Sequence, residues 1–185
     1  MTFRDFRDYN KVLIDGIPHD LYVIALVVFC AGTVMALGLK GWKGGWRKVI
    51  GLLLVEYVAL IYCSTVFCRK VSERVGHDFS PFWSYFSYFR GEDDGLLVEN
   101  IMNVVVFIPV GILLGCVFRH IKWWKVLLIG GGISISIETM QYFFKRGFAE
   151  VDDMMHNTLG CVIGYLLVQG AWFMVRGFRR RRIAG

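Results

Sequence analysis

The sequence predicts an all-α integral membrane protein: a bundle of five transmembrane helices with an aromatic helix between the second and third spans. Of its 185 residues 56% are hydrophobic, and the mean hydropathy is +0.51, which is more apolar than a soluble domain of this size. The apolar residues also come in blocks of about twenty, the length that crosses roughly 30 Å of hydrocarbon. These two observations together indicate several membrane crossings.

The five apolar blocks lie at about residues 21–39, 49–67, 101–118, 126–144 and 155–175. One membrane domain is therefore expected over residues 21–175, between an N-terminal tail (1–20) and a basic tail (176–185). The third block contains Phe107, Pro109 and Gly111, and we expect a kink there because proline removes a helical hydrogen bond. In the fifth block, Gly160 and Gly164 form a GxxxG pattern that predicts close helix packing.

The distribution of Lys and Arg predicts the orientation. The short loops between spans 1 and 2 and between spans 3 and 4, together with the C-terminal tail, are rich in basic residues, whereas the longer segments contain most of the acids. The positive-inside rule then places the N-terminus outside and the C-terminus in the cytoplasm. We interpret the arginine tail as a contact with anionic lipid of the bilayer, and we expect no nucleic-acid partner.

The connection from 68 to 100 is the longest between two blocks, and its centre is strongly aromatic. Seven of the eleven residues from Phe79 to Phe89 are aromatic. Ser80 and Pro81 form a favourable helix start, and aromatic side chains then recur at helical spacing. Aromatic rings favour the membrane–water boundary, so we expect an interfacial or re-entrant helix. It would serve either as a plain cover of the bundle or as a lid or lipid-contact surface.

Polar residues interrupt the apolar blocks near one end of the predicted bundle. Glu138 would lie roughly 9 Å from the outer end of the fourth span and shares a helix face with Ser134 and Gln141. A carboxylate in hydrocarbon costs about 2.5–3.5 kcal/mol on insertion scales, which makes such a residue a candidate for function. In the predicted orientation the polar residues collect at the outer end as Arg69, Asn100, Asn103, Glu138, Gln141, Arg146, Asp152, Asp153 and Asn157.

This convergence predicts an outward-open polar pocket with an acidic face opposed by Arg69 and Arg146 in buried charge pairs. The alternative is that the charges only set the helix register. Glu138 and Asp153 are candidates for a catalytic acid or base, with the arginines holding an anion. Asp152, Asp153 and His156 match no specific metal-ligand spacing, and no nucleophile elbow or P-loop is present. We therefore expect no metal and no cofactor, and whether the protein is an enzyme stays open.

Four groups of residues resemble the VanZ-like family of small bacterial membrane proteins. Three of them are Tyr57, Thr65 and Arg69 at the end of span 2, the Ser80-Pro81-Phe82 element, and span 3 from Asn100 and Asn103 to Gly111. The fourth comprises Glu138, Gln141, Arg146, Glu150, Asp152, Asp153, Asn157, Gly160 and Gly164. The resemblance covers roughly residues 50–170. The family has Asp at the position of Glu150, and His156 is outside its pattern.

The resemblance implies a bacterial plasma-membrane protein linked to low-level resistance to the glycopeptide teicoplanin, without a defined molecular activity. Three hypotheses follow. A non-enzymatic protein would modulate the cell surface and lower lipoglycopeptide action by binding a lipid-linked peptidoglycan precursor, a lipid head group or the antibiotic. A membrane-embedded enzyme would act on such a lipid or precursor. A small transporter or flippase is disfavoured, because no inverted repeat is evident and the polar residues lie on one side.

Overall fold

The computed structural model describes residues 45–69, 71, 76–92 and 95–184. The described helices are α3 (Gly45–Tyr62), its π-helical continuation η1 (Cys63–Phe67), α4 (Trp83–Phe89), α5 (Gly95–Val117), α6 (Trp123–Phe143) and α7 (Val151–Ala184). Two short strands, β1 (Gly76–Asp78) and β2 (Phe148–Glu150), complete the described elements. The first expected span (21–39) and the N-terminal tail (1–20) lie outside the described residues.

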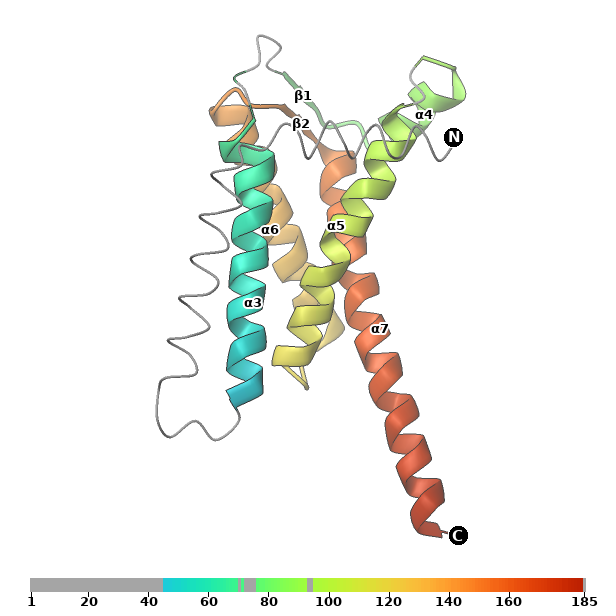
Figure 1. Cartoon of the computed structure of the whole chain (residues 1–185). Helices are drawn as coiled ribbons and strands as arrows, with labels where there is room; N and C mark the ends of the chain where they lie inside the picture. The colour runs from blue at the N-terminus through green and yellow to red at the C-terminus, as the bar shows by residue number, and fades with distance from the viewer. Residues whose placement is uncertain (1–44, 70, 72–75, 93–94, 185) are drawn as a thin grey trace.

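Within the described residues, four helical segments are long and apolar enough to cross a membrane. They are Gly45–Phe67, Gly95–Val117, Trp123–Phe143 and Val151–Gly177, and they correspond to the second to fifth expected spans. The protein is therefore a mostly helical, multi-pass membrane protein. Helix α7 also continues through most of the basic tail and extends beyond its neighbours (Figure 1).

Helices α5 and α7 pack with their backbones in contact. A Cβ atom added at Gly160 would lie 2.1 Å from the carbonyl oxygen of Val104, and one added at Gly164 would lie 2.0 Å from that of Ile108. Gly111 of α5 faces the carbonyl of Cys161 equally closely. Glycine alone permits this approach, and the close packing predicted from the GxxxG pattern is confirmed.

The apolar core lies between α3, α5, α6 and α7, and Phe107, Val110 and Ile137 are among its fully buried members. Helix α5 continues through Pro109. Close to this proline, the hydroxyl of Tyr57 on α3 donates a 2.9 Å hydrogen bond to the carbonyl of Val106. This bond connects α3 to α5 one residue after Val105, whose carbonyl loses its helical partner at the proline.

The strands were absent from the all-α prediction. β1 and β2 pair in parallel, with Gly76 opposite Phe148 and Asp78 opposite Glu150. They lie at the end of the bundle where η1 and α6 end and where α5 and α7 begin, and α4 lies at the same end (Figure 1). We call this the strand end.

The aromatic helix begins later than predicted, at Trp83 rather than at Ser80. Phe82 adopts a left-handed backbone conformation (φ 65°), which no α-helix can include. The N–H of Phe82 points instead at the carboxylate of Asp152 on α7, at 2.5 Å. A tertiary contact that sequence reasoning did not include therefore sets the start of α4. The placement of α4 at a membrane interface stays a prediction.

Candidate functional site

Polar side chains are buried inside the strand end of the bundle. On α6, Ser134, Glu138 and Gln141 are all buried on the shared face that their spacing predicts, and Glu138 is only 2% exposed. Asn100 of α5 and Asp152, His156 and Asn157 of α7 are buried with them. The structure thus brings these sequence-predicted polar residues to one end of the molecule.

Asp152 has a structural role. Its side chain is fully buried and accepts hydrogen bonds from the backbone N–H of Phe82 (2.5 Å), the backbone N–H of Ser84 (3.0 Å) and the hydroxyl of Ser84. Asn100 also donates to the Ser84 hydroxyl at 2.9 Å. A carboxylate is a good acceptor for the free N–H groups of a helix start. Asp152 therefore attaches α4 to α7 and is not a free pocket group.

His156 makes a second connection between α7 and α4. Its Nδ1 lies 2.5 Å from the carbonyl of Asp152, and its Nε2 lies 2.7 Å from the hydroxyl of Tyr85. Because a carbonyl oxygen only accepts, Nδ1 donates the first of these bonds. Both ring nitrogens thus have partners, and His156 holds α4 against α7.

Three amide side chains connect the helices across the strand end. Asn103 of α5 donates to the Asp153 carboxylate of α7 at 2.6 Å. Asn157 of α7 donates to the Ser134 hydroxyl of α6 at 2.9 Å. Gln141 of α6 donates to the carbonyl of Thr65 at 3.2 Å. These bonds hold α5, α6, α7 and η1 together at the strand end, where the carboxyl groups of Glu138 and Asp153 also lie.

Arg146 does not form the charge pair that the sequence predicted. Its guanidinium donates to three backbone carbonyls at the end of η1, those of Val66, Phe67 and Arg69. No carboxylate of the described residues lies within ion-pair distance of Arg146, and the same is true of Arg69. A helix leaves its last carbonyls without partners, and a cationic side chain is well suited to them. Arg146 is therefore a cap for the second span.

The carboxyl groups of Glu138, Glu150 and Asp153 interact with one another, and Arg69 lies near Glu138 and Asp153; we call these three acids the carboxylate cluster. The backbone N–H of Glu150 donates to Glu138 Oε2 at 3.3 Å, and the Arg69 guanidinium interacts electrostatically with Glu138 and Asp153. A Cβ atom added at Gly147 would lie 2.9 Å from Arg69 Nη1 and 3.1 Å from Gln141 Oε1, which places this guanidinium beside α6. The cluster thus combines α6, β2, α7 and the end of η1.

Glu150 lies in β2, outside the membrane-spanning segments. Burial, together with the nearby carboxyls of Asp153 and Glu99, raises the pKa of its carboxyl to about 8. The indole N–H of Trp83 is buried without a hydrogen bond of normal geometry, yet it lies close enough to the Glu150 carboxylate to lower that pKa slightly. At neutral pH this carboxyl therefore carries its proton most of the time.

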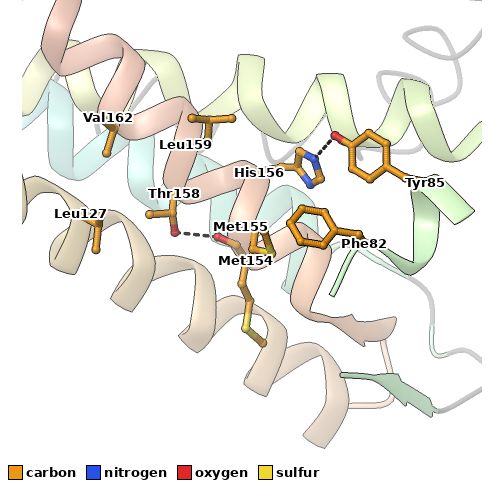
Figure 2. A pocket seen from close by; sticks show the side chains of 9 residues that line it. All are labelled: Phe82, Tyr85, Leu127, Met154, Met155, His156, Thr158, Leu159 and Val162. Atoms are coloured by element: carbon orange, nitrogen blue, oxygen red, sulfur yellow. Dashed lines mark hydrogen bonds between the residues drawn. The ribbon is translucent and has the colours of Figure 1, made fainter. Parts of the chain in front are cut away.

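An apolar groove of about 630 Å³ runs between α6 and α7 beneath α4. Leu127 of α6 and Met154, Thr158 and Val162 of α7 form its walls, and the ring of Phe82 lies at its α4 end (Figure 2). The groove opens along two membrane-spanning helices, where hydrocarbon is the surrounding solvent. It can accommodate an acyl chain by size and by polarity.

Sequence reasoning missed Ser84 and Tyr85, which supply polar contacts of α4. It also missed Trp83 and Glu99, which lie near Glu150. The only signal for the serines and tyrosines was their presence in an otherwise apolar aromatic helix. Among the described residues no group of three or more His, Cys, Asp or Glu side chains has the geometry to hold a metal ion.

Comparison with known proteins adds the family. The profile of the VanZ/LLP1 family matches residues 48–174, which is most of the chain. The chain belongs to the VanZ/LLP1 family. The resemblance seen in the motifs is thus confirmed, and the matched region contains Arg69 and the whole carboxylate cluster.

One curated relative is Protein VanZ of Enterococcus faecium, which is 33% identical over 69 residues. This match covers 37% of the present chain and 43% of that protein, so less than half of the relative's length is matched. No solved structure matches the chain.

Proposed function

We propose that this VanZ/LLP1 family protein of the bacterial plasma membrane binds a polar head group at its strand end and thereby lowers the action of lipoglycopeptides such as teicoplanin. The bound group belongs to a lipid-linked peptidoglycan precursor, a membrane lipid or the antibiotic itself. In this proposal five spans cross the membrane, the strand end faces outside and the C-terminus is cytoplasmic.

The carboxylate cluster beside Arg69 is the observation that carries the proposal. Ionisable groups from four separate segments meet at one end of helices that are otherwise apolar. Such groups are costly within a membrane protein and mark binding or transport sites more often than packing sites. Arg69 and Glu99 are exposed and Glu150 and Asp153 are partly exposed, so the cluster opens to the surroundings of the bundle end.

The surface of α4 supports an interfacial location for the site. Phe86 and Phe89 are 61% and 80% exposed, and aromatic side chains favour the head-group layer of a bilayer. A head group in that layer would reach the carboxylate cluster, while the apolar groove of Figure 2 offers a surface for hydrocarbon. An amphiphile with a polar head and an acyl tail matches both features.

The test is the teicoplanin susceptibility of bacteria that express the protein. We expect wild type to raise the minimum inhibitory concentration, and Arg69→Ala, Glu138→Gln and Asp153→Asn to reduce it to the vector level at equal membrane abundance. Glu92→Gln is the matched control, because Glu92 pairs with Arg90 on the protein surface outside the cluster. Full resistance in all three cluster variants would refute the proposal.

A second candidate is a membrane-embedded enzyme that acts on a lipid or a peptidoglycan precursor. The raised pKa of Glu150, about 8, favours it, because a carboxyl that titrates near neutral pH is suited to general acid–base catalysis. Glu138 and Asp153 stay the other candidates for the acid or base. Lipid and precursor mass profiles of cells with and without the protein separate the two functions, and identical profiles would exclude the enzyme.

A further inference from the structure

We infer that Cys63 and Cys68 form a redox-active dithiol at the strand end, which closes to a disulfide by exchange with a disulfide-bearing oxidant. Cys63 is the first residue of the π-helical turn η1, and Cys68 directly follows the turn. Single π-helical turns in α-helices are frequent at functional sites. The inference assigns a modification site to the protein, and it does not depend on the proposed binding of a head group.

The π-helical turn holds the backbones of the two cysteines at a distance that a disulfide can span. The N–H of Cys68 donates to the carbonyl oxygen of Cys63, five residues earlier, at 2.8 Å. A Cα atom lies about 2.4 Å from the oxygen of its own carbonyl and about 1.5 Å from its own nitrogen, so the two Cα atoms are at most about 6.7 Å apart. Disulfides join Cα atoms that lie about 4.4–6.8 Å apart. The two residues are therefore within bridging range.

The turn also brings the two side chains to the same side of the helix. In an α-helix, a residue five positions later is rotated by about 140° around the axis, so the two side chains diverge. The i→i+5 bond of η1 adds one residue to the turn, and residue 68 then lies above residue 63. The thiols of Cys63 and Cys68 interact electrostatically, which agrees with this proximity.

Both thiols are accessible to a reagent. Cys63 and Cys68 are free and partly exposed, whereas Cys161 of α7 is buried. The membrane-spanning segment ends at Phe67, so Cys68 is the thiol that meets a water-soluble oxidant first. In the proposed orientation the strand end faces outside, where the environment is oxidising and disulfides persist.

The exchange takes two steps. The Cys68 thiolate attacks the disulfide of the oxidant, and the first leaving thiolate takes up the proton that Cys68 has lost, which leaves a mixed disulfide on Cys68. Cys63 then attacks the sulfur of Cys68, and its proton passes to the second leaving thiolate. Two cysteine thiols are thus oxidised, and one external disulfide is reduced to two thiols.

The same geometry favours a reversible bridge over a permanent one. The Cα–Cβ bonds of a helix all lean in the same direction, so a disulfide within one turn requires the turn to adjust. A disulfide strained in this way is reduced more readily than an ideal one. The two cysteines are therefore suited to repeated oxidation and reduction.

The pair brackets a segment that is important for the strand end. The carbonyls of Val66 and Phe67, which accept from Arg146, lie between the two cysteines, and Arg69 directly follows Cys68. The disulfide therefore cross-links the turn that Arg146 caps, one residue before the guanidinium that lies near the carboxylate cluster.

The experiment exposes the full chain in lipid nanodiscs to oxidised glutathione, and the remaining thiols are then blocked with N-ethylmaleimide under denaturing conditions. Trypsin releases one peptide, residues 49–69, that contains Cys63 and Cys68 and no other cysteine. We expect this peptide to lose two hydrogens and to carry neither glutathione nor the blocking group. Treatment with dithiothreitol should restore both thiols, and the buried Cys161 should stay a free thiol throughout.

Variants complete the test. In Cys63→Ser no neighbouring thiol displaces the glutathione from Cys68, so the glutathione adduct of this peptide should be at least about tenfold more abundant than in wild type. Cys116→Ser is the matched control, because Cys116 is also free and partly exposed but lies on α5, and it should behave like wild type. The inference is wrong if the wild-type peptide keeps both thiols, if it accumulates as much adduct as Cys63→Ser, or if its disulfide joins two chains.

Discussion

Replacing Arg146 by alanine tests whether this arginine is a structural cap. The substitution removes donors from three carbonyls at the end of η1, those of Val66, Phe67 and Arg69. A buried hydrogen bond to a charged group contributes about 1.5–3 kcal/mol. The donor in all three contacts is Nη1, which has two N–H groups, and Arg146 is only half-buried. We therefore take about 1 kcal/mol for each N–H and expect a loss of about 2 kcal/mol. For a chain of this length that lowers the Tm by about 4–8 °C.

Thermal unfolding in detergent, followed by circular dichroism, measures this loss. Arg69→Ala is the matched control, because it removes the same residue type at the same end of the bundle. Its side chain is exposed, and we expect a change of about 1 kcal/mol or less. Arg146→Lys should recover only part of the loss, because the shorter lysine side chain ends before the position that Nη1 of the arginine occupies. Equal stabilities of the two alanine variants would refute the distinction between a structural Arg146 and a binding Arg69.

Three further predictions concern the rest of the strand end and the helix packing. Asp152→Asn leaves a donor of α4 without an acceptor, so we expect a local destabilisation of about 1–3 kcal/mol. Amide hydrogen exchange in α4 should then be at least tenfold faster. Unchanged exchange would contradict the role of Asp152 in anchoring α4. Gly160→Ala forces α5 and α7 apart and should lower the free energy of unfolding by about 2–3 kcal/mol. Gly170 has open space around it, so Gly170→Ala should be neutral or stabilising. Equal effects of the two substitutions would refute the backbone contact. Because the pKa of Glu150 is raised to about 8, the folded state keeps a proton that the unfolded state loses above pH 4.5. The free energy of unfolding should therefore fall between about pH 5 and 8. This fall should be smaller in Glu150→Gln. A pH profile identical in both proteins would argue against that shift.

The membrane-spanning helices could be predicted because each one is encoded in a single continuous run of apolar residues. The buried face of α6 was also predictable, since Ser134, Glu138 and Gln141 recur at helical spacing along one segment. The contact of Gly160 with the backbone of α5 follows from a local small-residue pattern in the same way.

The remaining features depend on contacts between segments that are far apart in the chain. β1 and β2 have three residues each and are separated by α4, α5 and α6, so no periodic pattern marks them. The start of α4 depends on Asp152, whose carboxylate lies about seventy residues later in the chain. Charge alone made Arg146 a candidate partner for the acids, but the free carbonyls at the end of η1 are the nearer acceptors. The residue types thus predicted which polar side chains lie at the strand end. Their hydrogen-bond partners depend on the backbone geometry there.

A structure of the protein in a lipid bilayer, determined by electron cryo-microscopy, tests the central claim most directly. The account predicts non-protein density within hydrogen-bond distance of the carboxylate cluster, close to Arg69. An Arg69 guanidinium paired directly with Glu138, in a strand end filled by protein side chains alone, would contradict it.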